Sequence, residues 1–244
     1  MRFSIAALWL AGVVMGQDRP SGVPLNTWVR EDIFAGFLAA DMPRFEAGMA
    51  KVERELKANP TDSDALSWRG GGKLLLAVRA QDAGKSDEFT RLYSEARTDF
   101  AKAAEVAQGK PTMTGVYAIV GGSYTVFADR FPAGLRREAW TASQENYLAL
   151  RNLQKPYFEQ IPLHMRGEIL SGLAQAAQRL GDTETATQRL NEVIEKLPGS
   201  PYATRARRWQ EQPATAAKTS ITCQMCHEDG RLAPMMAKRP AAAR

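Results

Sequence analysis

Residues 166–199 read RGEILSGLAQAAQRLGDTETATQRLNEVIEKLPG, and they carry the clearest helical pattern of the chain. Its apolar residues recur at spacings of three and four on both sides of Gly181, which predicts two consecutive amphipathic helices. Gly181 is placed to end the first helix, Asp182 to cap the second, and Pro198 to stop it. Two antiparallel helices cannot bury their apolar faces alone, so the stretch predicts a hairpin that packs against similar neighbours.

The second helix of this hairpin resembles that of a tetratricopeptide repeat. The family spacing A-x3-F-x2-A-x4-P is matched by Ala186, Leu190, Val193 and Pro198. Less complete versions of the spacing occur at residues 48–60, 96–111 and 142–149. The resemblance implies an all-α array of antiparallel, tetratricopeptide-like helix hairpins, with a generic helical bundle as the alternative.

The composition predicts a folded protein, and the N-terminal stretch predicts that it is exported. Of the 244 residues 44% are hydrophobic, which is enough for a sizeable core. The first stretch, MRFSIAALWLAGVVMG, has one arginine and then a short apolar run, as in a secretory signal peptide. The run is shorter than the roughly 20 residues that span a bilayer. We therefore expect a periplasmic or secreted protein, associated with a membrane only if this segment stays uncleaved.

The pattern divides the chain into five parts. We expect a signal peptide at 1–16, an N-terminal lead at 17–27, the repeat domain at 28–209, a linker at 210–222 and a tail at 223–244. The linker prediction rests on the sequence QEQPATAAKTSIT, which contains a proline and no large apolar residue except Ile221. Such a linker would let the tail swing freely or fold back on the repeats.

The tail contains both cysteines of the chain, in the motif C-x-x-C-H, formed by Cys223, Cys226 and His227. This is the attachment signature of c-type haem. Two thiols three positions apart can bond the two vinyl groups on one porphyrin edge, while the neighbouring imidazole binds the iron. The following HEDGRLAPMM is similar to the segment after the haem motif in small monohaem cytochromes c. That resemblance implies one covalent haem c per chain, with His227 as the proximal ligand.

The sixth iron ligand is not fixed by the motif. Small cytochromes c take a methionine from far downstream, whereas this sequence stops at Arg244, so the tail is not expected to wrap a haem by itself. The nearby thioethers are those of Met235 and Met236, and the other histidine of the chain is His164. A five-coordinate iron, or a ligand from a partner protein, is the third option.

Two other uses of the cysteines stay open. A structural zinc ion needs four ligands, and beyond the motif the sequence offers only His164 or the carboxylates of Glu228 and Asp229. A disulfide between Cys223 and Cys226 suits an oxidising compartment. Either would make the protein a non-enzymatic interaction scaffold with a disulfide or metal clip.

Charge and the remaining motifs favour an electron carrier or binding protein over a bond-making enzyme. Residues 199–244 hold eight basic and three acidic residues, a surplus equal to the whole formal net charge of +5. This surplus fits either a solvated basic tail or one that steers acidic partners or anionic lipid, and an acidic redox protein on the repeat surface is the partner we expect. Export argues against nucleic acid. The run RGGGK at 69–73 lacks the first glycine of a phosphate loop, and Leu74 replaces its Ser or Thr, which indicates close helix packing or a bent helix instead. We expect periplasmic electron transfer or a haem-bearing subunit of a redox complex.

Overall fold

The computed structural model describes residues 19–222, and within this range the protein is all-helical, with no β-strand. The predicted signal segment and the tail from Cys223 lie outside the described residues. The helices are α1 (Leu25–Ala39), α2 (Met42–Ala58), α3 (Ser63–Asp82), α4 (Ser86–Ala107), α5 (Met113–Phe127), η1 (Ala128–Arg130), α6 (Ala133–Gln154), η2 (Lys155–Gln160), α7 (Leu163–Leu180), α8 (Thr183–Lys196), α9 (Pro201–Glu211) and α10 (Pro213–Ala216).

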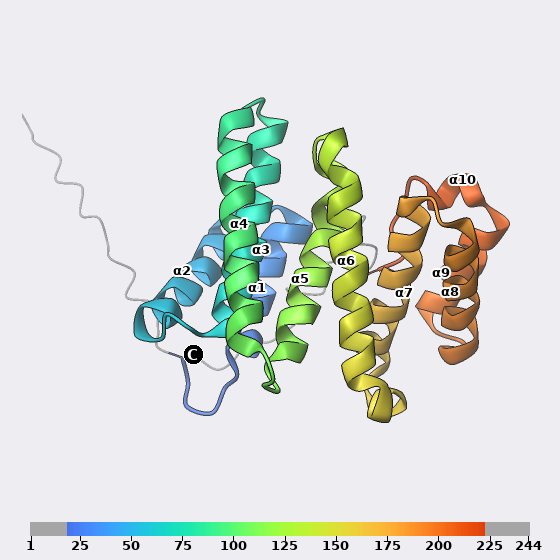
Figure 1. The fold of residues 1–244 in the computed structure, drawn as a ribbon, viewed down its shortest axis with the longest axis horizontal. Helices are drawn as coiled ribbons and strands as arrows, with labels where there is room; N and C mark the ends of the chain where they lie inside the picture. The colour runs from blue at the N-terminus through green and yellow to red at the C-terminus, as the bar shows by residue number, and fades with distance from the viewer. Residues whose placement is uncertain (1–18, 223–244) are drawn as a thin grey trace, which may run out of the picture.

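The helices pair in chain order as α1 with α2, α3 with α4, α5 with α6, and α7 with α8 (Figure 1). Short connections make each pair an antiparallel hairpin, and α9 and α10 cover the last one. The predicted all-α hairpin array is therefore confirmed. The stretches that carried the repeat-like spacing fall on α2, α4, α6 and α8, which are the second helices of the four hairpins.

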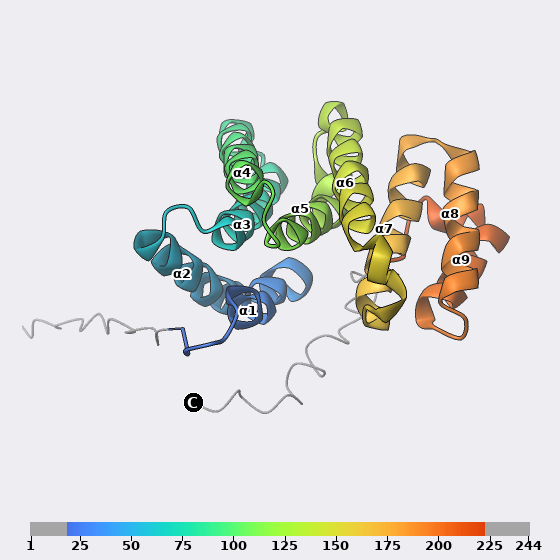
Figure 2. The same ribbon diagram turned by 60° about the horizontal axis from the view of Figure 1, so that its bottom comes forward.

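The hairpins follow an arc, with α1, α5 and α7 toward its inner side (Figure 2). The first helices of successive hairpins contact one another, α1 with α3, α3 with α5, and α5 with α7. Contacts of this kind place the first helices in one continuous layer. Within the described range, no helix combines the length and apolarity needed to cross a membrane.

The hairpin that decided the prediction has the expected boundaries. Gly181 ends α7 in the left-handed region with φ 82°, a conformation that a residue with a Cβ adopts only under strain. The Asp182 carboxylate caps α8 by accepting a hydrogen bond from the N–H of Thr185 at 3.0 Å. Such a cap gives one backbone N–H at the helix start a hydrogen-bond acceptor and stabilises the helix by about 1 kcal/mol. Helix α8 ends at Lys196, two residues before Pro198.

The three glycines of RGGGK lie inside α3 and let three neighbours approach it. A Cβ at Gly70 would lie 2.5 Å from the ring of Phe100 in α4, and one at Gly71 would lie 2.7 Å from Ser123 Oγ in α5. A Cβ at Gly72 would meet a methionine of α2. The run therefore serves helix packing, as predicted.

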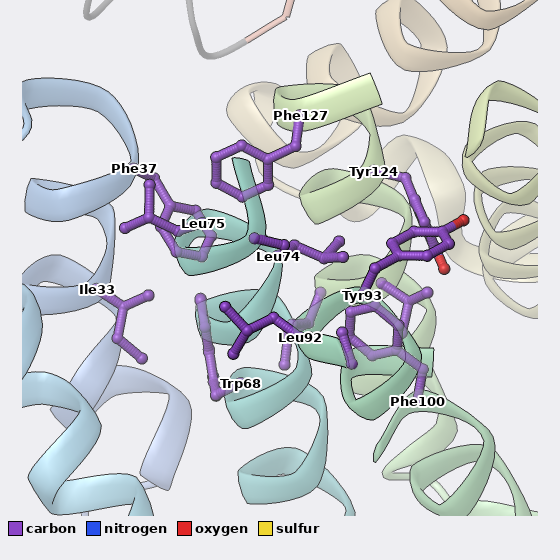
Figure 3. Close-up of a cluster of buried hydrophobic side chains, with 14 of the residues drawn as sticks. Ile33, Phe37, Trp68, Leu74, Leu75, Leu92, Tyr93, Phe100, Tyr124 and Phe127 are labelled. Carbon is purple, nitrogen blue, oxygen red and sulfur yellow. The ribbon is translucent and has the colours of Figure 1, made fainter. Parts of the chain in front are cut away.

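Buried side chains form two clusters that divide the array near α6. The first consists of residues of α1 to α6 and Ala176 of α7, and it is rich in aromatic rings (Figure 3). In it, Phe37 of α1 and Phe127 of α5 meet edge to face with ring centroids 4.9 Å apart, a favourable aromatic geometry. The second cluster includes residues of α6 to α10 and also Ile221, which follows the last helix.

The connection to the tail differs from the predicted linker. Helix α9 continues to Glu211, α10 follows it, and the residues after α10 lie against α7. Ile221, the one large apolar residue of this stretch, is fully buried. Burying an isoleucine stabilises by about 1.5–3 kcal/mol, and hydrogen bonds from α7 add to this. The expected flexible connection is instead part of the folded array.

Candidate functional site

Most of the residues predicted to hold a haem lie beyond the described part of the chain. These are Cys223, Cys226, His227, Met235 and Met236. The structure does place His164, which is the second residue of α7. It also places Thr222, the residue directly before Cys223, so the surroundings of Thr222 show where the motif begins.

We refer to residues 217–222 as the terminal segment. Its last three residues are buried, with 5% of Ser220, none of Ile221 and 2% of Thr222 exposed. Ile221 belongs to the second hydrophobic cluster, together with residues of α6, α7 and α9. The residue before the first motif cysteine is therefore fixed against the array.

Arg179, in the last turn of α7, holds the terminal segment by its backbone. Its Nη1 donates to the carbonyl oxygen of Ala216 at 2.6 Å, and its Nη2 donates to that of Thr219 at 2.9 Å. The guanidinium lies 5.8 Å from the ring centroid of Trp140 and 6.0 Å from that of Trp209, within cation–π range. The indole N–H of Trp209 in turn donates to Thr219 Oγ1 at 3.0 Å.

Gln175, one turn earlier on α7, holds the end of the segment. Only 1% of Gln175 is exposed, and its Oε1 accepts hydrogen bonds from Ser220 Oγ and from the N–H of Ile221, both at 3.0 Å. The hydroxyls of Ser220 and Thr222 also lie 3.0 Å apart. Because a buried polar group without a partner costs about 1–3 kcal/mol, these bonds select one position for the segment.

Thr222 lies at the wall of a cavity of about 210 Å³ on the inner side of the array, which we call the inner cavity. Helices α1, α3, α5, α6 and α7 supply the other lining residues. Most of the lining side chains are apolar, including Phe34, Phe37, Trp68, Ile119, Leu150 and Ile169. His164, Met165 and Glu168 line the same cavity from α7.

His164 is held by a chain of hydrogen bonds that starts at Glu168. The Tyr202 hydroxyl donates its proton to Glu168 Oε1 at 2.7 Å and lies 2.9 Å from His164 Nδ1. A phenol has one proton, so a Tyr202 hydroxyl that donates to the carboxylate accepts from Nδ1–H of the imidazole. A Cβ at Gly167 would lie 2.2 Å from the Tyr202 ring, so the glycine allows Tyr202 to reach this position.

The inner cavity suits part of a porphyrin. Its walls are largely apolar, as a flat hydrophobic ring requires, and an imidazole stands among them. Pockets that enclose a whole ligand measure roughly 300–1,000 Å³, so a cavity of about 210 Å³ would have room only for an edge of such a ring. Within residues 19–222, no three His, Cys, Asp or Glu side chains form a group that could hold a bare metal ion.

The sequence suggested His164 as a candidate ligand, which stays a prediction, but it did not indicate the side chains that surround His164 and the terminal segment. Tyr202 is 38 residues from His164, and Arg179 is 40 from Thr219, so no local spacing connects them. One signal was present: Gln175 and Arg179 are polar residues spaced by four in the alanine-rich helix LAQAAQRL. A polar pair on one face of such a helix indicates that this face meets something polar.

Comparisons with protein-family models, with curated proteins and with solved structures found no match to this chain. The features of this chain that bear on function are the C-x-x-C-H motif in the sequence and the buried terminal segment that precedes it.

Proposed function

We propose that this protein is an exported haem carrier, built as a tetratricopeptide-like array with one covalent haem c. Cys223 and Cys226 would provide the thioether bonds and His227 the proximal ligand. The carrier would work in electron transfer or as the haem-bearing subunit of a periplasmic redox complex. One observation supports the proposal above the others: the buried terminal segment ends at Thr222, in the wall of the apolar inner cavity.

The tether limits where the porphyrin can lie. Neighbouring Cα atoms are about 3.8 Å apart, and the last described residue, Thr222, is in the cavity wall. A porphyrin joined to the next residue in the sequence would be tethered close to the inner cavity. Bound haem supplies one-electron exchange at its iron. The array would contribute an apolar wall that excludes water from one edge of the ring and so influences the reduction potential.

A protein partner would approach the same part of the array. Four large apolar side chains at the corner between α6 and α7 are 44–47% exposed, namely Leu153, Tyr157, Leu163 and Met165. Met165 also lines the inner cavity, which connects this apolar corner to the proposed haem position. Exposed apolar side chains next to a cavity are typical of interaction surfaces. The basic surplus of residues 199–244 favours an acidic redox protein as the partner.

The proposal is tested by exporting the full chain in a host that attaches haem c and recording the reduced spectrum in alkaline pyridine. That spectrum distinguishes haem with two thioether bonds from haem with free vinyl groups. We expect the thioether form, and we expect it to disappear in the double variant Cys223→Ala, Cys226→Ala. A colourless wild-type protein, or haem that acidified solvent extracts, would favour the interaction scaffold with a disulfide or metal clip.

A further inference from the structure

We propose that a second cavity of the array, which we call the segment cavity, binds a small organic monoanion and that this ligand fastens the terminal segment to the array. The cavity measures about 260 Å³ and adjoins the inner cavity, with which it shares Phe37, Leu38, Thr125 and Val126. Its other walls are η1, α7 and residues 218–220 of the terminal segment. The inference requires no haem and so goes beyond the proposed function.

Gln175 provides the first contact for such a ligand. Its side chain lines the segment cavity and is 1% exposed. Its Oε1 accepts from the backbone N–H of Ile221, a group that can only donate, so the other end of the amide is the NH₂ group. This Nε2 donates to no other described residue. Because buried donors are normally hydrogen-bonded, we expect Nε2 to bind an acceptor that enters the cavity.

The charges around the cavity favour a negatively charged acceptor. Three cations line it, Arg130, Arg179 and Lys218, against the single carboxylate of Asp129. Arg179 is paired with Asp129 at 3.0 Å, which leaves Arg130 and Lys218 for a ligand. Lys218 is exposed and forms no ion pair with another described residue. Arg130 is paired with Asp82 at the surface, a contact weak enough for a ligand to compete with it.

The helix ends at the cavity determine which charge the ligand should carry. Helix α1 ends at Ala39 and α7 at Leu180, each within two residues of a lining residue. A helix C-terminus carries about half a negative charge, so the two ends offset roughly one of the two remaining cationic charges. The remaining positive charge suits a monoanion.

The size and the apolar walls of the cavity indicate the body of the ligand. A cavity of about 150 Å³ can hold benzene, so one of about 260 Å³ has room for a single ring with an acidic group. Phe37, Leu38 and Val126 provide apolar contacts for the ring. A small aromatic carboxylate therefore fits both the polar and the apolar walls.

A ligand in this position would contact the terminal segment and the rest of the array together. Lys218 belongs to the segment, whereas Arg130 belongs to η1 and Gln175 to α7. A ligand that binds only while the segment is docked stabilises the docked state by mass action. At about ten times its Kd, it should make opening of the segment about tenfold rarer.

The test titrates the full chain with benzoate and with benzamide, its neutral isostere, by calorimetry at constant ionic strength. We expect saturable binding of benzoate and binding of benzamide that is at least about tenfold weaker. Amide exchange at Ile221 should become about tenfold slower in near-saturating benzoate, while exchange in α3 stays the same.

A pair of lysine variants assigns the binding to this cavity. Lys218→Met should weaken benzoate binding about tenfold, because it removes one of the two available cations. Lys102→Met, at an exposed ion pair of α4, is the matched control and should bind benzoate as the wild type does. No saturable benzoate binding, equal binding in the two variants, or exchange at Ile221 that benzoate does not slow would overturn the inference. None of these outcomes bears on whether haem is attached.

Discussion

The first two hairpins and the last part of the array both bury polar side chains, but they use them differently. In the second hairpin, the buried carboxylate of Asp99 is paired with cations from the adjacent helix. Asp99 of α4 is 5% exposed and binds Arg69 at 2.6 Å and Lys73 at 2.9 Å, both from α3. The carboxylate of Asp99 also raises the pKa of Arg69, chiefly through their hydrogen bond.

In the last hairpin, the polar groups of α7 are directed at the terminal segment and toward the inner cavity. Gln175 and Arg179 hold the segment, and Glu168 orients His164 through Tyr202. None of these bonds joins α7 to α8, its own partner in the hairpin. The difference indicates that the first hairpins form a self-contained scaffold, whereas α7 has a face built to position another part of the chain.

The largest effect should come from breaking the scaffold at Asp99. Asp99→Ala leaves Arg69 and Lys73 without their shared buried carboxylate, which should lower the free energy of unfolding by about 3 kcal/mol. Urea denaturation measures this change in the free energy of unfolding. Asp82→Ala, which removes an exposed ion pair to Arg130, is the control and should cost less than about 1 kcal/mol. If both variants lost the same free energy of unfolding, the buried ion pairs of Asp99 would stabilise the protein no more than a surface ion pair does.

The next effect should come from Gly167→Ala on α7. The added Cβ would lie 2.2 Å from the ring of Tyr202 and must displace it, at a cost of about 2 kcal/mol. Gly134→Ala on α6 meets no atom within 4 Å and should be neutral or stabilise by less than about 1 kcal/mol. Thermal unfolding of the two variants measures the difference in stability. An unchanged stability in Gly167→Ala would show that Tyr202 is loosely packed.

Arg179→Met should release the terminal segment. It removes the two hydrogen bonds to the carbonyls of Ala216 and Thr219, together with the ion pair that Arg179 makes with Asp129 of η1. We expect amide exchange at Ile221 to rise about tenfold or more, with protection of α3 and α4 unchanged. Arg130→Met, at an exposed ion pair, is the control. Unaltered exchange at Ile221 would mean that its own burial is sufficient to hold the segment.

The smallest effect concerns Asp64, in the first turn of α3. Burial raises the pKa of its carboxyl to about 6, with a smaller contribution from the charge of Asp62, and Oδ1 has no hydrogen-bond partner among the described residues. Because the folded-state pKa exceeds the ordinary value of 3.8, ionisation costs stability as the pH rises from about 4 to about 6.

Asp64→Asn should therefore stabilise the protein by about 1 kcal/mol at pH 7.5, after allowance for partial exposure, and give no gain at pH 4. Urea denaturation at the two pH values measures this, with the exposed Asp87→Asn of α4 as the control. A gain that is the same at both pH values would assign the effect to packing instead of charge.

Local patterns in the sequence were sufficient for the scaffold. Helix periodicity, Gly181 and the Asp182 cap are properties of neighbouring residues, and they predicted the hairpin of α7 and α8 correctly. Similarly, three adjacent glycines in α3 indicated close packing before any neighbour was known. The hairpin array follows from such local signals because each hairpin must bury its faces against the next.

The position of the terminal segment could not be predicted, because it depends on contacts between residues about 40 positions apart. A stretch with one large apolar residue reads as a linker, although Ile221 and the bonds from Gln175 are enough to fix it. The C-x-x-C-H motif, by contrast, is a local pattern that the sequence alone shows. His164 was identifiable as a candidate only because the chain has so few histidines.

The most direct measurement is the intact mass of the full chain after export from a host that attaches haem c. Covalent attachment at Cys223 and Cys226 predicts the mass of the processed polypeptide plus one haem, with the added mass lost when both cysteines are replaced by alanine. A wild-type mass equal to that of the processed polypeptide alone would contradict the haem carrier.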